Sequence, residues 1–173
     1  MTTATIVPLS EYLSTAYRPD CDFLEGELLE RNMGEQQHGA IQGFFVRFFG
    51  NHRSDWQVRV LPEQRVQVRP ERFRIPDVCV LRSSDPWDPI VRFAPLLCIE
   101  VLSFADSTRS LQDRVDDYAA MGVEHIWAVD PWKRLGYYAS ASGFQQPEDG
   151  VLRIAGTPIA VVLAEVFAEL DPA

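Results

Sequence analysis

Apolar residues recur along this chain at two spacings, one typical of helices and one typical of strands. Between residues 35 and 49 they lie three and four positions apart, which predicts an amphipathic helix with a buried face rich in phenylalanine. A second helix is predicted over residues 108–121, since aspartate and serine precede it and Gly122 follows it. Shorter helices are predicted at residues 10–17 and 163–170.

Short apolar or alternating runs between these helices predict β-strands. Gly26 divides the first run into a hairpin, and residues 82–89 are predicted to form a loop. The predicted strands cover residues 23–30, 56–62, 64–69, 75–81, 96–102, 124–130, 135–139, 151–154 and 158–161. Because the chain has no internal repeat and no linker, residues 1–173 are expected to form a single α/β domain, with a mixed β-sheet flanked by helices.

Two carboxylates interrupt two of these apolar runs. Asp77 lies in the run at residues 74–80, and Glu100 lies in the run at residues 96–102. Carboxylates are almost never fully buried unless they are paired or bound to a metal, because desolvating a lone charge is costly. If the two strands pair with Asp77 beside Glu100, the Cβ atoms would lie roughly 5 Å apart. One acid would then protonate unless a cation lay between them.

The pair of acids therefore predicts a divalent-metal site. Carboxylate oxygens suit Mg²⁺ or Mn²⁺, which bind one or two carboxylates together with waters and a substrate phosphate. A metal at this position could bind a water nucleophile and stabilise the leaving oxygen in phosphodiester hydrolysis. The alternative is a structural acid pair with no metal, but burying two unpaired carboxylates is costly.

Three further side chains are candidates for the same site. Arg114 lies on the flank of the apolar stripe of its predicted helix and could balance the charge of Glu100, although a surface ion pair with Asp113 or Asp117 would also explain it. His38 begins the phenylalanine-rich helix, and its pKa would suit proton transfer, but a structural histidine is the alternative.

Glu35 lies in the first turn of that same helix. It is a candidate metal ligand, and it is equally well explained as an acid that interacts favourably with the helix dipole.

Composition and charge limit the class of protein. With 46% hydrophobic residues the chain is too apolar for disorder, and no run is long enough to span a bilayer, so a cytoplasmic protein is expected. The net charge of −9 repels phosphate backbones unless positive charge is concentrated locally. Lys133 is the sole lysine, so nearly all positive charge is arginine. A local phosphate-binding rim, or ordinary solvated turn charges, would explain the arginines at positions 65, 69, 72, 74 and 82.

These residues resemble the PD-(D/E)XK nuclease superfamily, named for an acid after proline and then an acid-x-lysine on the next strand. More narrowly, the chain resembles the bacterial Uma-two family, whose members are regarded as restriction endonucleases. The resemblance runs from about Leu9 to Leu170. It is carried by residues 23–28, the helix of His38, Pro76-Asp77-Val78, residues 99–103 and residues 118–131.

The resemblance implies a restriction-endonuclease-like fold and hydrolysis of DNA, with a divalent metal held by Asp77 and Glu100. In the family a first acidic ligand usually comes from the opening core helix, and Glu35 is its match here, with His38 beside it. Double-strand cutting would favour a homodimer. No separate recognition domain is visible in the sequence, so the target sequence stays open.

The chain departs from the superfamily pattern at the lysine. Leu102 stands two residues after Glu100, and members of the family supply the lysine from the following helix, four residues before the tyrosine, where this chain has Arg114. Arginine can neutralise a phosphate but is a poor base for activating water. Two hypotheses follow: a metal-dependent DNA endonuclease with Arg114 as its electrostatic element, or a catalytically impaired member that binds nucleic acid or a protein.

Overall fold

A six-stranded sheet forms the centre of the protein in the computed structural model, which describes residues 6–31 and 34–172. The strand order is β10-β9-β8-β7-β6-β3. These strands are β3 (Val58–Pro62), β6 (Val78–Arg82), β7 (Leu97–Val101), β8 (His125–Asp130), β9 (Leu135–Ser140) and β10 (Gly143–Gln145). The pair β7 and β8 is parallel, and the other neighbouring pairs are antiparallel. The sheet is mixed, as predicted.

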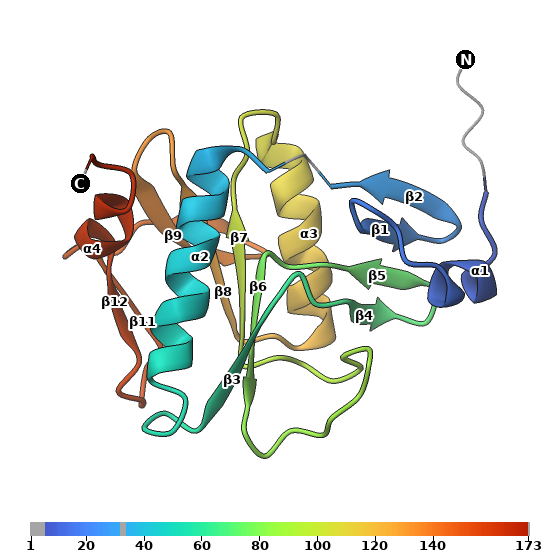
Figure 1. Ribbon diagram of the computed structural model, residues 1–173, viewed down its shortest axis with the longest axis horizontal. Helices are drawn as coiled ribbons and strands as arrows, with labels where there is room; N and C mark the ends of the chain where they lie inside the picture. Colours follow the sequence, from blue (N-terminus) through green and yellow to red (C-terminus); the bar gives the residue numbers. More distant parts are fainter. Residues whose placement is uncertain (1–5, 32–33, 173) are drawn as a thin grey trace.

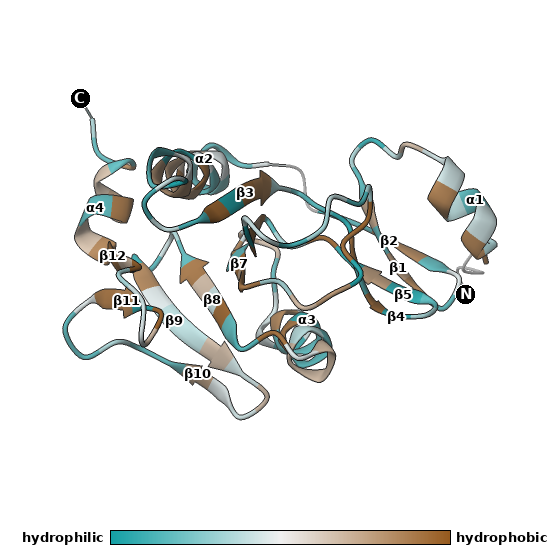
Figure 2. Cartoon of the chain, turned by 90° about the horizontal axis from the view of Figure 1, so that it is seen from below, coloured by the Kyte–Doolittle hydropathy of each residue, from teal (hydrophilic) through white to brown (hydrophobic). Residues whose placement is uncertain are grey.

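Helices cover both faces of this sheet. The helices are α1 (Leu9–Ser14), α2 (Gln36–Asn51), α3 (Thr108–Met121) and α4 (Leu163–Ala168). Figure 2 shows α2 and α3 on opposite sides of the strands. Side chains alternate across a strand, so one core contains Phe45 of α2 with Ile99 of β7, and the other contains Val115 of α3 with Cys98 of β7. The predicted helices at residues 35–49 and 108–121 are confirmed.

A smaller sheet stands beside the central one, at the right in Figure 1, in the order β2-β1-β5-β4. Its strands are β1 (Cys21–Leu24), β2 (Glu27–Glu30), β4 (Val66–Arg69) and β5 (Arg72–Arg74), and a separate pair near the C-terminus comprises β11 (Val151–Arg153) and β12 (Ala160–Val162). Aromatic side chains of Tyr12, Phe23 and Phe73 form the core between the small sheet and α1. The hairpin predicted at residues 23–30 is confirmed as β1 and β2.

The strand predicted at residues 75–81 is wrong at its start. β5 ends at Arg74 in the small sheet, and β6 begins at Val78 in the central sheet. Pro76 lies between them and has no N–H to donate to a strand ladder, which accounts for the break. Asp77 therefore lies in the connection at which the chain passes from one sheet to the other.

Candidate active site

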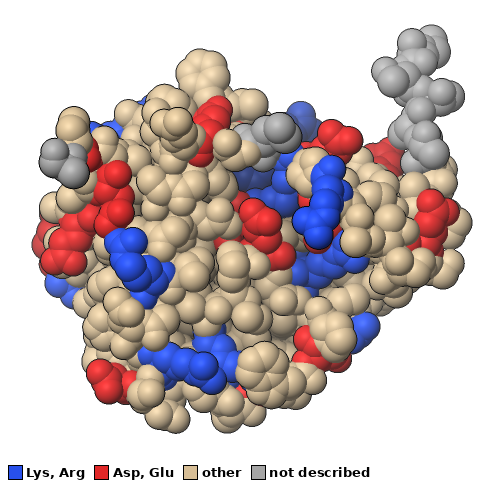
Figure 3. Space-filling view, in the orientation of Figure 1, with Lys and Arg blue, Asp and Glu red and all other residues tan. Residues whose placement is uncertain are grey.

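A cleft of about 1150 Å³ opens where the two sheets adjoin. Side chains of both signs gather close together on the surface over this region (Figure 3). The lining includes the small sheet, the start of α2, the segment after β7 and one side of α3. Four of the five candidate site residues line this cleft, namely Glu35, His38, Asp77 and Arg114, and the fifth, Glu100, does not.

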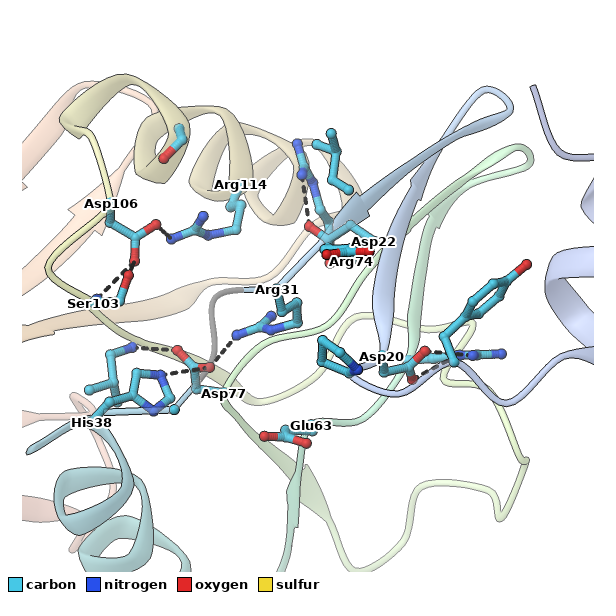
Figure 4. A pocket seen from close by; sticks show the side chains of 18 of the residues that line it. Asp20, Asp22, Arg31, His38, Glu63, Arg74, Asp77, Ser103, Asp106 and Arg114 are labelled. Carbon is cyan, nitrogen blue, oxygen red and sulfur yellow. Dashed lines mark hydrogen bonds and ion pairs between the residues drawn. The ribbon is translucent and has the colours of Figure 1, made fainter. Parts of the chain in front are cut away.

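Asp77 is buried at the wall of the cleft, with 2% of its surface exposed. Its Oδ2 accepts a 2.7 Å hydrogen bond from the backbone N–H of Val101, which ties it to the end of β7. Its Oδ1 contacts the Arg31 guanidinium and lies 3.2 Å from Nε2 of His38 (Figure 4). Burial raises the pKa of Asp77, but Arg31 and His38 outweigh it, and the pKa is lowered. Asp77 is therefore held as a carboxylate.

Glu100 lies across from Asp77 in the strand register. Val78 of β6 pairs with Ile99 of β7, so the next step along the antiparallel pair brings Asp77 opposite Glu100. Glu100 is fully buried; its Oε1 accepts a 2.6 Å hydrogen bond from the Tyr118 hydroxyl. Burial raises the pKa of Glu100 to about 6; the charge of Asp77 adds to this effect, and Arg114 opposes it. The two acids have the neighbouring placement that the sequence predicted.

Arg114 supplies the positive charge beside Glu100. Its Nε lies 3.0 Å from Oε2 of Glu100, and its Nη2 donates a 3.1 Å hydrogen bond to Oδ1 of Asp106. Asp106 in turn accepts hydrogen bonds of 2.9 Å from the backbone N–H and the hydroxyl of Ser103. The alternative of a surface pair with Asp113 or Asp117 is wrong, because the contacts of Arg114 run to the buried acid and to the loop after β7.

His38 and Glu35 both lie at the start of α2, but they differ in their contacts. Burial lowers the pKa of His38, yet the hydrogen bond and charge of Asp77 outweigh it and leave the pKa raised. Glu35 precedes α2 as its N-cap residue and does not cap the helix with its side chain. Both of its carboxylate oxygens lie 3.3 Å from the backbone N–H of Phe104, which donates to them. Glu35 is thus on the rim, while His38 touches Asp77.

Arg31 is a cleft residue that the sequence analysis missed. It follows β2, and its guanidinium lies against Asp77, 46 positions later in the chain. No local pattern distinguishes it from the other arginines, because it ends an ordinary hairpin strand. The contact depends on how the small sheet adjoins the central one, so the fold rather than the sequence reveals it.

The arginines for which the sequence left open a phosphate-binding rim or solvated turn charges are largely bound to carboxylates. Arg74 donates to Asp22 at 2.9 Å and to Asp117 at 2.7 Å, and Arg72 donates to Asp117 at 2.8 Å. Asp22 also accepts a 3.0 Å hydrogen bond from the backbone N–H of Ile75, two residues before Asp77. This buried network fixes the connection that carries Asp77. Arg65 is paired with Asp20, and Arg69 lies 3.8 Å from Asp117.

The donor set matches a metal ion that keeps much of its water. Within residues 6–31 and 34–172 no three His, Cys, Asp or Glu side chains are grouped as ligands for a metal. Mg²⁺ is nevertheless bound by one or two carboxylates with waters and substrate phosphates. Oε2 of Glu100 is buried and has the Arg114 Nε at 3.0 Å as an ion-pair partner, so a metal ion at Glu100 would share this oxygen with that guanidinium. Asp77 and Glu100 could hold such an ion if Arg31 moved away from Asp77.

A family match decides the relationship of this chain to known proteins. The Uma2 model, described as "Putative restriction endonuclease", matches residues 9–155. The chain belongs to the Uma2 family. No curated protein matches the sequence. A solved structure from Anabaena variabilis, a "putative nuclease belonging to DUF820", is 19% identical, with a TM-score of 0.80 over 95% of this chain and 99% of that chain.

The Uma2 match and the structural likeness confirm the fold prediction and the resemblance on which it rested. The Uma2 match also supports a nuclease as the class of protein. The roles assigned to Asp77, Glu100, Arg114, His38 and Glu35 stay predictions, as does the metal. In the part of the Uma2 chain that the structure describes, no helix is long and apolar enough to cross a membrane.

Proposed function

We propose that this Uma2 protein is a metal-dependent endonuclease that hydrolyses phosphodiester bonds in DNA. The observation that carries the proposal is the pair of buried carboxylates, Asp77 and Glu100, on adjoining segments. Asp77 lines the cleft, and Glu100 lies behind it in β7. Such a pair is costly to bury without cations, and the family match adds a nuclease context. Asp77 and Glu100 would hold Mg²⁺ or Mn²⁺.

The bound ion would supply an activated water and charge stabilisation at the phosphate. Arg114 keeps Glu100 ionised through the 3.0 Å contact, and its planar guanidinium suits the negative charge of a phosphate. His38 carries a raised pKa, so it retains a proton to higher pH and is suited to protonate the leaving oxygen. Glu35 would act from the rim, where it accepts from the Phe104 N–H.

The Arg31 guanidinium would occupy two positions, one in the metal-free protein and one in the metal-bound protein. Against Asp77 it provides the cation that the buried carboxylate needs in the metal-free protein. If a divalent ion were bound at Asp77, Arg31 would be free to turn into the cleft, where its guanidinium could bind a phosphate oxygen. Arg31 would therefore compete with the ion for the same carboxylate.

A catalytically impaired protein that binds nucleic acid or a protein is the second candidate. Arg114 stands where relatives are expected to carry lysine, and arginine cannot take a proton from water. The net charge of −9 also disfavours a large phosphate-binding surface.

Cutting both strands of a duplex would need two active sites, which a homodimer would supply. A DNA substrate agrees with the cytoplasmic location expected from the sequence.

Nicking of supercoiled plasmid at low salt tests the proposal. The wild-type protein is expected to nick plasmid with Mg²⁺ or Mn²⁺ and to be inert in EDTA. If the wild type is inert with both ions but Arg114→Lys cuts, the chain is a disabled nuclease. If neither cuts, the binding function becomes the better account.

A further inference from the structure

Two large aromatic side chains lie exposed and in contact beside the cleft. Phe104 is 80% exposed and Trp132 is 46% exposed. Their ring centroids are 5.8 Å apart, with the ring planes at 78°. Phe104 follows β7 and Trp132 follows β8, and these strands are parallel neighbours, so both rings stand at the same end of the central sheet.

The pair adjoins the proposed active site directly. Ser103 and Ala105, on either side of Phe104, line the cleft. The backbone N–H of Phe104 donates to the cleft residue Glu35, with both oxygens at 3.3 Å. A ligand in the cleft would therefore lie next to the segment that carries Phe104, and the ring of Trp132 lies against the ring of Phe104.

Hydrogen bonds anchor the backbone of both residues. The N–H of Trp132 donates to Oδ1 of Asp130 at 2.9 Å, which fixes the turn after β8. The Phe104 N–H is held by Glu35 in the same way. Two adjoining exposed rings on anchored backbone form a surface ready for a flat apolar partner, and such patches mark interaction sites.

The pairing of the arginine side chains indicates which part of a DNA ligand the two rings would bind beside the proposed active site. Most arginines of the described chain are already paired with carboxylates, among them Arg65, Arg72 and Arg74 in the cleft. The attraction for a long run of phosphates is therefore small. Stacking of bases on aromatic side chains can supply affinity instead, independent of base sequence. Bases inside a duplex are stacked on one another, so only an unpaired base is available.

We propose that Phe104 and Trp132 form a stacking platform for an unpaired nucleobase, so that the substrate of this site is DNA with a single-stranded segment rather than uninterrupted duplex. The proposal rests on the proposed nuclease function and specifies its substrate class. The platform holds the base, and the strand then runs into the cleft towards Asp77.

Binding of a fluorescent oligothymidine strand and of a blunt duplex of equal length, in EDTA so that nothing is cut, tests the platform. The wild type should bind the single strand more tightly. Phe104→Ala and Trp132→Ala should each weaken single-strand binding roughly tenfold, the change expected for one lost stacked base. Both side chains are exposed, so neither change should disturb the fold.

Trp87 provides the matched control. It is 78% exposed, but it lies in the loop that enters β7 rather than the one that leaves it, and its ring covers the Arg59 guanidinium at 4.1 Å. Figure 1 shows that loop at the opposite end of the central strands. Trp87→Ala should leave single-strand binding unchanged.

Each outcome decides between the two proposals. Unchanged single-strand binding in Phe104→Ala and Trp132→Ala, or an equal loss in Trp87→Ala, overturns the platform; if the wild type still nicks plasmid with Mg²⁺, the nuclease function stands without it. Lost binding in the two variants, with no cleavage of either plasmid or the single strand by the wild type in Mg²⁺, supports the platform on an inactive nuclease fold. If the variants change self-association in gel filtration but not DNA binding, the rings are a protein contact and the platform is wrong.

Discussion

The guanidinium of Arg31 lies against the carboxylate of Asp77 and holds that carboxylate ionised in the wall of the cleft. Arg31 directly follows β2 of the small sheet, and Asp77 directly precedes β6 of the central sheet. The contact therefore joins the two sheets at the proposed active site. It also fills the place where a divalent ion would approach Asp77, so the protein carries its own cation for the metal-free state.

Replacing Arg31 with methionine is expected to exchange a built-in cation for a dependence on metal. In EDTA, Arg31→Met should lose roughly 3 kcal/mol of unfolding free energy, because Asp77 loses its main counter-charge. Mn²⁺ should then stabilise the variant more than it stabilises the wild type, because the ion no longer competes with a guanidinium. Urea denaturation with and without Mn²⁺ measures both effects.

Arg18→Met is the control for that experiment. Arg18 is exposed and lines the same cleft, and no ion pair joins it to a carboxylate among the described residues. The Arg18→Met substitution removes the same charge without touching Asp77. The unfolding free energy and its response to Mn²⁺ should therefore stay close to wild type. Equal stabilisation of wild type and Arg31→Met by Mn²⁺ would contradict the competition between arginine and metal.

Asp117 should be a principal stabiliser of the connection that carries Asp77. It is buried on α3 and accepts from Arg72 and Arg74, whose strand leads into that connection. Asp117→Asn removes the buried carboxylate that two guanidinium groups share, although Arg74 keeps Asp22 and Arg72 keeps Glu25. The change should cost about 3 kcal/mol of unfolding free energy. Asp116→Asn, on the exposed face of the same helix, should change it by less than about 0.5 kcal/mol. Similar losses in both variants would show that the network does not hold the junction.

The stability of the metal-free protein should depend on pH through His38. Its pKa is raised above the ordinary 6.5 because the hydrogen bond and charge of Asp77 outweigh burial and the repulsion of Arg31. A raised pKa means that the folded state binds the proton more tightly. The contribution of the charged His38–Asp77 pair to the unfolding free energy is therefore complete below pH 6.5. It is lost as the pH rises through the raised pKa of His38.

His38→Gln should remove that part of the pH dependence. In EDTA the unfolding free energy of the wild type should fall between pH 6.5 and alkaline pH more steeply than that of the variant. His125 provides the comparison, since burial lowers its pKa and His125→Gln should leave the alkaline fall intact. Parallel curves for wild type and His38→Gln would rule out the charged pair with Asp77.

Arg114→Lys should report on the missing lysine. The lysine ammonium can still balance Glu100, which Arg114 contacts at 3.0 Å, and its neutral amine can take a proton from water. Plasmid nicking with Mg²⁺ should therefore be retained or increased in Arg114→Lys, and lost in Arg114→Met. Lower activity in Arg114→Lys than in Arg114→Met would contradict an electrostatic role for this position.

The sequence predicts those parts of the fold in which the hydrophobic period is strong. The phenylalanine stripe of α2 follows from spacing alone. The neighbouring placement of Asp77 and Glu100 was a hypothesis that depended on the pairing of their strands, and the register of β6 and β7 agrees with it. The short strand β10 was missed, because three residues are too few to show a period. The break at Pro76 was also missed. The proline is a local signal for it, but residues 72–82 are otherwise almost continuously apolar or basic, a pattern that predicts one strand after a turn.

The site residues were predictable where the local sequence distinguishes them. They were not predictable where only tertiary contacts bring them to the site. Glu100 is conspicuous as a charge inside an apolar strand, and Arg114 lies one helical turn before Tyr118. Arg31 stands in a polar stretch, and Asp117 is one of several acids on α3. Their partners are more than 40 residues away in the chain, so only the folded structure assigns them.

The most direct test of the metal-dependent endonuclease is nicking of supercoiled plasmid by wild type, Asp77→Asn and Asp113→Asn with Mg²⁺ or Mn²⁺. Asp113 is exposed and lines the same cleft, so its replacement removes an equal charge without touching the buried pair. The account predicts nicking by wild type and Asp113→Asn, none in EDTA, and a loss of at least about 100-fold in a folded Asp77→Asn. Undiminished nicking by Asp77→Asn would contradict it.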